Sequence, residues 1–171
     1  SDWQTSADPN NKNFELDNLI KTRDPRFEAT FYKKPTVNSL SSLLYTVKFI
    51  SREGLKYPDE GGAVSEENKG SNNVNDYPVL RLAEVLLNWI EAKAELATLG
   101  GTPVNQDDID NSINKIRDRE LGTDAIAAGV KKTEHMKLAS LPNSPNRAEV
   151  SQLIWEIRRE RRMELAFEHS R

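Results

Sequence analysis

The chain has 171 residues, with 24 lysines and arginines against 27 aspartates and glutamates, so its formal net charge is −3. This length fits about one domain, and a mean hydropathy of −0.71 predicts long polar loops around the core. The chain has no cysteine, which excludes disulfides, thiolate metal sites and a cysteine nucleophile. No apolar run reaches the roughly 18 residues of a transmembrane helix, and the polar N-terminus does not have the pattern of a signal peptide.

Residues 1–76 form the first predicted unit, a loop-rich segment with short extended runs. Turn-forming residues cluster at 23–27, where proline suits the second position of a turn. β-Branched and aromatic residues at 27–32 and 45–50 predict short strands or extended segments. Glycine, asparagine and acidic residues dominate 53–76, which predicts a loop.

Residues 77–122 have the pattern of an antiparallel helical hairpin. Along 79–99 apolar side chains fill most of the helical circle, which predicts a helix covered on several sides, with Trp89 in the core. A pair of glycines ends this helix. The second helix begins at Asn105, with an acidic residue three positions later as in a capping box, and runs to Arg119. Such hairpins are the unit of tetratricopeptide-like α-solenoids.

The rest of the chain is predicted to be a loop at 123–145 and a helix at 146–171. The helix lacks glycine, proline or a cap at its C-terminal end, so the pattern is cut off at the chain end and indicates a fragment. The predicted fold class is therefore mainly α. It consists of a tetratricopeptide-like hairpin and a long C-terminal helix, preceded by an extended, loop-rich part.

One face of the last helix changes from apolar to charged residues. Its apolar part consists of Val150, Leu153, Ile154 and Ile157, and the charged residues that continue it at helical spacing are Arg161, Glu164, Glu168 and Arg171. These charges are either exposed pairs on a solvated half-helix or a buried, hydrogen-bonded structural network. Arg159 falls on the opposite side, where we expect it to be exposed.

Other candidate sites have less support. Arginine and glutamate interleave around the last helix, so no one-signed stripe predicts nucleic-acid binding. His135 and His169 have no second histidine at helical spacing, which argues against a metal site. No Ser-His-Asp order is recoverable either. The acidic residues of 59–67 do not match the spacing of an EF-hand, and whether they hold a calcium ion stays open.

Aromatic residues in loops are the candidate ligand-binding residues. Trp3 and Tyr57 lie in or beside predicted loops, and exposed rings can stack on the apolar faces of sugars. The alternative is that these rings anchor the loops or join the core.

Four segments resemble the C-terminal region of the RagB/SusD family, and they occur in the family's order. They are RDPRF at 23–27, YPVLRLAEVLLNWIEA at 77–92, INKIRDR at 113–119 and ERRMELAFEHSR at 160–171. The resemblance implies a SusD-like glycan- or nutrient-binding lipoprotein on the surface of the outer membrane of Bacteroidota. Such a protein delivers oligosaccharide to a TonB-dependent transporter of the SusC type.

The resemblance also implies that the protein is not an enzyme, needs no cofactor, and has its lipid anchor upstream of this chain. It assigns no sugar-binding residue, because the family's sugar sites have no portable motif. Two alternatives stay open. One is a helical scaffold module for protein–protein interaction without sugar binding of its own, and the other is a glycan-active enzyme.

Overall fold

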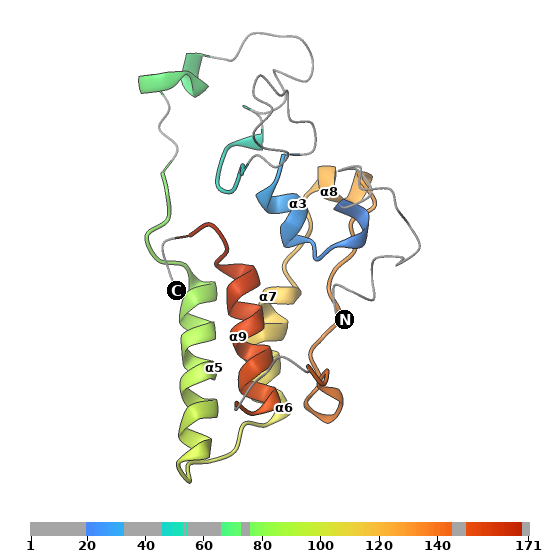
Figure 1. Cartoon of the computed structure of the whole chain (residues 1–171). Helices are drawn as coiled ribbons and strands as arrows, with labels where there is room; N and C mark the ends of the chain where they lie inside the picture. The colour runs from blue at the N-terminus through green and yellow to red at the C-terminus, as the bar shows by residue number, and fades with distance from the viewer. Residues whose placement is uncertain are drawn as a thin grey trace.

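The computed structural model describes residues 20–32, 46–52, 54, 66–72, 76–144 and 150–168. Regular structure in these ranges is mainly helical (Figure 1). The α-helices are α3 Arg26–Thr30, α5 Leu82–Thr98, α6 Gln106–Ile109, α7 Lys115–Arg117, α8 Thr123–Ala127 and α9 Gln152–Glu164. A π-helical turn, η3 Asp110–Asn114, joins α6 to α7, and short 3-10 turns are η1 Glu66–Asn68, η2 Gly70–Asn72 and η4 Leu138–Ser140.

Helix α5 and the continuous α6–η3–α7 run form the predicted antiparallel hairpin. Helix α5 ends in a Schellman motif, in which the Gly101 N–H donates to the Leu96 carbonyl (2.9 Å) and Gly100 adopts φ +94°. The second run begins with a capping box. The Asn105 side chain accepts from the Asp108 N–H (3.0 Å), and the Asp108 carboxylate accepts from the Asn105 N–H (2.9 Å). The mainly α fold with its tetratricopeptide-like hairpin is confirmed.

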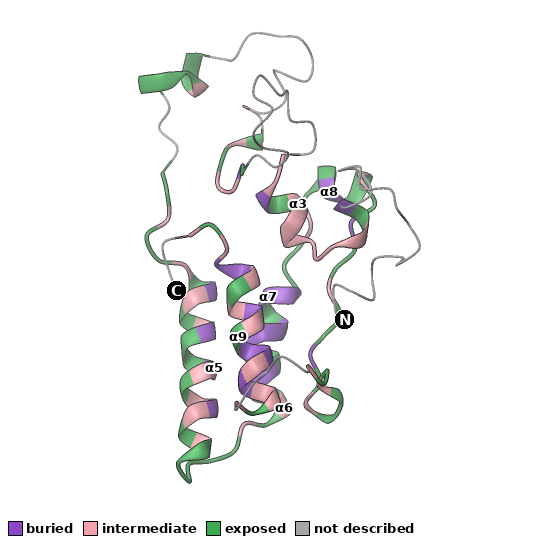
Figure 2. Ribbon diagram, viewed as in Figure 1, coloured by how far each residue is buried: buried purple, intermediate pink, exposed green. Residues whose placement is uncertain are grey.

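The core lies where α9 packs against both helices of the hairpin. Figure 2 shows the buried residues on the facing sides of α5, α7 and α9. Leu87 and Ile90 of α5, Ile109 and Ile113 of the second run, and Ile157 of α9 are fully buried. These apolar side chains explain why α9 lies beside the hairpin, since burying each of them contributes roughly 1.5–3 kcal/mol.

The prediction that Trp89 lies in the core is wrong. Only one stripe of α5 is buried in the part of the chain that the structure describes. Its buried residues are Ala83, Leu87, Ile90 and Ala94. Trp89 lies beside this stripe with 44% of its surface exposed, and the Lys93 ammonium lies 5.5 Å from its ring centroid. The apolar arc of the sequence is wider than the side that α9 and η3 cover, so Trp89 and Leu96 face outward.

Helix α9 is shorter than the predicted helix at 146–171. It begins after Ser151, whose side chain accepts a hydrogen bond from a backbone N–H three residues on. It ends at Glu164, although the sequence has no glycine there. The Lys48 Nζ donates to the carbonyls of Glu164 (2.7 Å) and Ala166 (2.9 Å). A distant lysine therefore caps the helix C-terminus, a role in which its positive charge also meets the helix dipole favourably.

The two predicted extended runs are mostly not strands. The first, 27–32, lies largely in helix α3, whose first turn is stabilised by Asp24 accepting the N–H two residues on (3.0 Å). The second, 45–50, contributes Thr46, which pairs with Phe31 in an isolated antiparallel bridge. Most of the loop predicted at 53–76 lies outside the described residues.

Candidate functional site

Helix α9 and the residues after it carry carboxylates at four-residue intervals: Glu156, Glu160, Glu164 and Glu168. This spacing places neighbouring carboxylates on one face of a helix. Glu160 is fully buried and Glu164 is 2% exposed. Because removing an unpaired carboxylate from water is very costly, cations must accompany these two residues.

Glu160 lies between two arginines from distant parts of the chain. The Arg117 Nη2 donates to Glu160 Oε2 at 2.6 Å, and the Arg117 Nε donates to the same oxygen at 3.2 Å. On the other side, the Arg26 Nη1 lies 2.9 Å from Glu160 Oε1. Arg117 is itself 7% exposed, so this part of the network is shielded from solvent.

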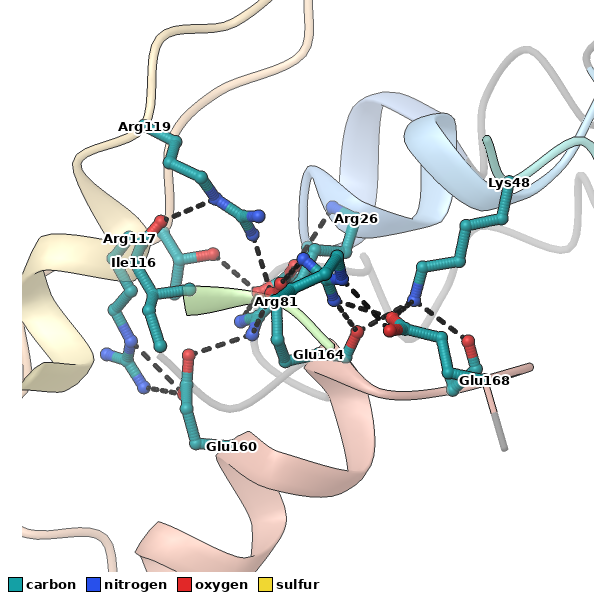
Figure 3. Close-up of polar contacts among 12 residues, drawn as sticks. Arg26, Lys48, Arg81, Ile116, Arg117, Arg119, Glu160, Glu164 and Glu168 are labelled. Carbon is teal, nitrogen blue, oxygen red and sulfur yellow. Dashed lines mark hydrogen bonds and ion pairs between the residues drawn. The ribbon is translucent and has the colours of Figure 1, made fainter. Parts of the chain in front are cut away.

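Glu164 and Glu168 share Arg81, the N-cap residue of α5 (Figure 3). The Arg81 Nη1 donates to Glu164 Oε1 (2.9 Å), while its Nη2 and Nε contact the two oxygens of Glu168 (2.5 and 2.9 Å). Arg119 supplies a second cation to Glu164 (2.6 Å), and Lys48 supplies one to Glu168 (2.5 Å). We call these residues the carboxylate network: Arg26, Lys48, Arg81, Arg117, Arg119, Glu160, Glu164 and Glu168.

Arg26 connects the carboxylate network to the turn that precedes α3. Its Nε and Nη2 form a bidentate pair with the two oxygens of Asp24 (2.6 and 2.8 Å). The hydroxyl of Thr133 donates to the same carboxylate (2.7 Å). Arginine suits this position because its planar fork can bind two carboxylates at once.

The pKa values follow from burial and pairing. Burial alone raises the pKa of the Glu160 carboxyl, but the charges of Arg26 and Arg117 outweigh this effect and hold that pKa below its usual range. Burial likewise raises the pKa of Glu168 and of Asp24. Their arginine partners lower it by more, so both pKa values lie below their usual range. Carboxylates with lowered pKa values are poor proton donors and acceptors near neutral pH. The geometry of the network therefore suits a structural clamp.

These lowered pKa values predict acid sensitivity. Each carboxyl group has a lower pKa in the folded chain than its unfolded value of about 4, so its stabilisation is present above that pH and is lost as the pH falls. We expect a steady melting temperature from pH 7 to about 5.5, followed by a decline at lower pH. Calorimetry across this pH range measures the melting temperature. The Asp24→Asn variant lacks one of these carboxyl groups, so its melting temperature should decline less steeply as the pH falls. A melting temperature that rises from pH 5 to 3 would contradict the interpretation.

The carboxylate network contains different residues from the network of Arg161, Glu164 and Glu168 that the sequence predicted. Glu164 and Glu168 come together around Arg81. Arg161 instead reaches α5, where its guanidinium contacts the side chain of Asn88 and lies 3.7 Å from Glu84. It points there because the face of α9 that it occupies is covered by α5.

The sequence analysis missed six of the eight network residues: Arg26, Lys48, Arg81, Arg117, Arg119 and Glu160. Among the described residues, Glu160 is the most buried carboxylate, and the four-residue repeat of glutamates was the sequence signal that pointed to it. Arg26 lies in the segment 23–27, which was interpreted as a turn and as part of the family resemblance but not as part of a charged network. Arg159, outside the network, is half-buried rather than exposed, and its Nη2 and Nε both contact one oxygen of buried Glu156 (2.7 and 2.9 Å). Both aromatic candidates, Trp3 and Tyr57, lie outside the described residues.

Aromatic rings lie beside the network. Phe49 meets Tyr77 edge to face (5.3 Å between centroids), and Phe31 meets Phe167 in the same way (5.4 Å). The Tyr77 hydroxyl donates to the Phe167 carbonyl (3.2 Å). Phe49 and Phe167 both have positive φ, 65° and 63°, which is unusual for residues with a side chain. The backbone therefore turns sharply at Phe49, which follows Lys48 of the network, and at Phe167, which precedes Glu168.

A cavity of about 360 Å³ lies against the network, between α3, the 47–52 segment and the end of α7. Within the described ranges no cluster of three or more histidines, aspartates and glutamates is arranged to hold a metal ion. His135 lies 2.6 Å from an oxygen of Asp118 at the surface. Of the acidic loop considered for calcium, Glu66 and Glu67 are described, and Glu66 pairs with Lys69.

The described part of the chain defines a mainly helical protein of tetratricopeptide-like architecture, in which a buried carboxylate network joins distant segments. A family model described as the SusD family matches residues 2–171. The chain therefore belongs to the SusD family, whose members are glycan- and nutrient-binding proteins generally found at the cell surface. Searches of curated proteins and of solved structures gave no significant match. None of the described helices is both long and apolar enough to cross a bilayer.

Proposed function

We propose that this protein captures oligosaccharide at the cell surface and delivers it to a TonB-dependent, SusC-like transporter. The observation that carries the proposal is the family match over residues 2–171. In this proposal a lipid attached upstream of the chain holds the protein on the outer membrane, the protein has no enzymatic activity, and it needs no cofactor. In this proposal the buried carboxylates hold the fold together, since their lowered pKa values make them poor general acids.

Ring stacking is the proposed means of sugar binding, with Trp3 and Tyr57 as the candidate residues. Titration calorimetry with a panel of neutral oligosaccharides tests this, together with chromatography of the sugars after incubation. We expect heat of binding without hydrolysis products. Trp3→Ala and Tyr57→Ala should each weaken binding roughly five- to tenfold, since one aromatic contact contributes about 0.5–1.5 kcal/mol beyond its buried area.

Trp89→Ala is the matched control, because it removes a half-exposed aromatic ring of α5 that is not a candidate ligand-binding residue. Equal losses in all three variants would contradict the assignment of Trp3 and Tyr57. Release of shorter sugars by the wild-type chain would contradict the proposal of a binding protein and would favour an enzyme.

A helical scaffold without sugar affinity is the second candidate function. It is favoured by the apolar side chains that α5 exposes, among them Leu82, Val85 and Leu96. Apolar patches of this kind often mark protein interaction sites. Co-purification with the transporter, combined with no heat of binding for any oligosaccharide, would select this candidate over the first.

A further inference from the structure

A groove runs between α9 and the segment that follows α8, on the side of the helices away from α5. Two adjoining hollows, of about 330 and 600 Å³, form this groove, and both are lined by Arg117, Glu134 and Arg159. Figure 1 shows the segment after α8 descending beside α7 and α9 toward α6. Each hollow has the size of a small-molecule site, typically about 300–1,000 Å³, and the residues that both hollows share place them side by side.

The outer wall of the groove is fixed by side chains of the hairpin. Asn114, at the end of the π-helical turn, accepts the Met136 N–H (2.7 Å) and donates to the Met136 carbonyl (3.1 Å). Gln106 accepts the Leu138 N–H (2.9 Å), and Arg117 donates to the Glu134 carbonyl (2.6 Å). π-Turns often occur at functional sites. A wall held by side chains in this way is pre-organised, which lowers the entropic cost of binding a ligand.

The smaller hollow is strongly basic. Its lining contains six cationic side chains and two anionic ones, Asp24 and Glu134. The cations are Lys21, Arg23, Arg117, Lys131, Lys132 and Arg159. This excess is opposite in sign to the net charge of the whole chain, −3. A concave surface of one sign concentrates ligands of the other sign.

The positive charge of the hollow lies mainly at its mouth. Deeper in the groove, Arg117 and Arg159 are paired with the buried carboxylates of Glu160 and Glu156. At the mouth, Lys21 and Lys131 are exposed. Lys132 is exposed too, and its Nζ donates to the neutral carbonyl of Asp118 (2.7 Å). The mouth thus offers ammonium groups to a ligand, while the paired groups deeper inside offer a polar surface for hydroxyl groups.

We propose that this groove binds an anionic oligosaccharide, with a carboxylate or sulfate group held at the basic mouth and neighbouring sugar rings lying along α9. This inference rests on the proposed function and adds the class of its substrate.

The test is titration calorimetry of the chain with three probes: tetragalacturonate, sulfated maltotetraose and neutral maltotetraose. We expect one of the two acidic sugars to bind more tightly than maltotetraose, and the better of them identifies carboxylate or sulfate as the preferred group. Its affinity should fall as the NaCl concentration rises, because salt screens exposed charges.

The variant Lys21→Gln/Lys131→Gln removes two exposed charges from the mouth. It should weaken binding of the acidic sugar by about five- to tenfold, as expected for two exposed ion pairs. The control Lys115→Gln/Arg162→Gln loses the same charge at two exposed positions that do not line the groove. It should keep the affinity within about twofold, since distant surface charges are screened.

Three outcomes would overturn the inference. If maltotetraose binds as tightly as both acidic sugars, the protein binds sugars without selecting for charge, and only the inference fails. If both double variants lose affinity equally, net charge rather than the groove attracts the ligand. If neither these probes nor the neutral panel bind, the proposed sugar-binding function fails together with the inference.

Discussion

Replacing Glu160 by glutamine should lower the free energy of unfolding by about 3–5 kcal/mol, the usual result of breaking a buried ion pair. Glutamine has nearly the same shape as glutamate, so the substitution removes charge without emptying space. It would leave Arg26 and Arg117 facing a neutral amide in a site from which water is excluded. Urea denaturation followed by circular dichroism measures the change.

Glu95→Gln is the matched control for Glu160→Gln. Glu95 pairs with Arg158 (2.9 Å), but its side chain is 43% exposed. Exposed pairs typically contribute about 0–1 kcal/mol, so this variant should differ from the wild type by about 0.5 kcal/mol or less. Equal effects of the two substitutions would show that the network is hydrated and would contradict its role as a clamp.

Local signals in the sequence predicted the hairpin well. The glycine pair that ends α5 and the capping box at Asn105 act through bonds between residues a few positions apart. Their geometry follows from backbone chemistry alone. The family resemblance was confirmed by the match over residues 2–171.

The errors concern contacts between distant segments. The periodicity of the sequence shows on which side of its helix Trp89 lies, but it does not show which side of that helix is covered by another element. The end of α9 at Glu164 depends on Lys48, which lies 116 positions earlier in the chain. No pattern within the helix contains that information, so the sequence predicted a helix that continued to residue 171.

The carboxylate network also depends on distant partners. The spacing of Glu164 and Glu168 predicted a charged face on the last helix. Whether that face is solvated or buried depends only on which other segments of the chain lie against it. Opposite it lie arginines from α3, the start of α5 and the end of α7. A four-residue repeat of glutamates was the one signal that could have included Glu160.

The network and the groove share residues. Arg117 binds Glu160 with two nitrogens and the Glu134 carbonyl with the third, so one guanidinium joins the buried network to the wall of the groove. Asp24 pairs with Arg26 of the network and also lines the basic hollow. The clamp that stabilises the fold therefore also determines where the proposed ligand groups lie.

Arg26→Lys tests whether the clamp depends on the shape of arginine or only on its charge. Arg26 binds Asp24 through two nitrogens and reaches Glu160 with a third. Lysine has a single ammonium on a flexible stem and cannot reproduce this fork. We expect a loss of about 1.5–3 kcal/mol, the contribution of a hydrogen bond to a charged group, while Arg26→Ala should cost about 3–5 kcal/mol.

A double-mutant cycle with Asp24→Asn locates the effect. Because Asp24 and Arg26 are in direct contact, the two substitutions should not be additive, and the coupling energy should lie between about 0.5 and 3 kcal/mol. Arg162→Lys is the control, since Arg162 is exposed and should tolerate the change within about 0.5 kcal/mol. If Arg26→Lys matches the wild type in urea denaturation, positive charge alone is sufficient. The fork would then have no role in joining α3 to α9.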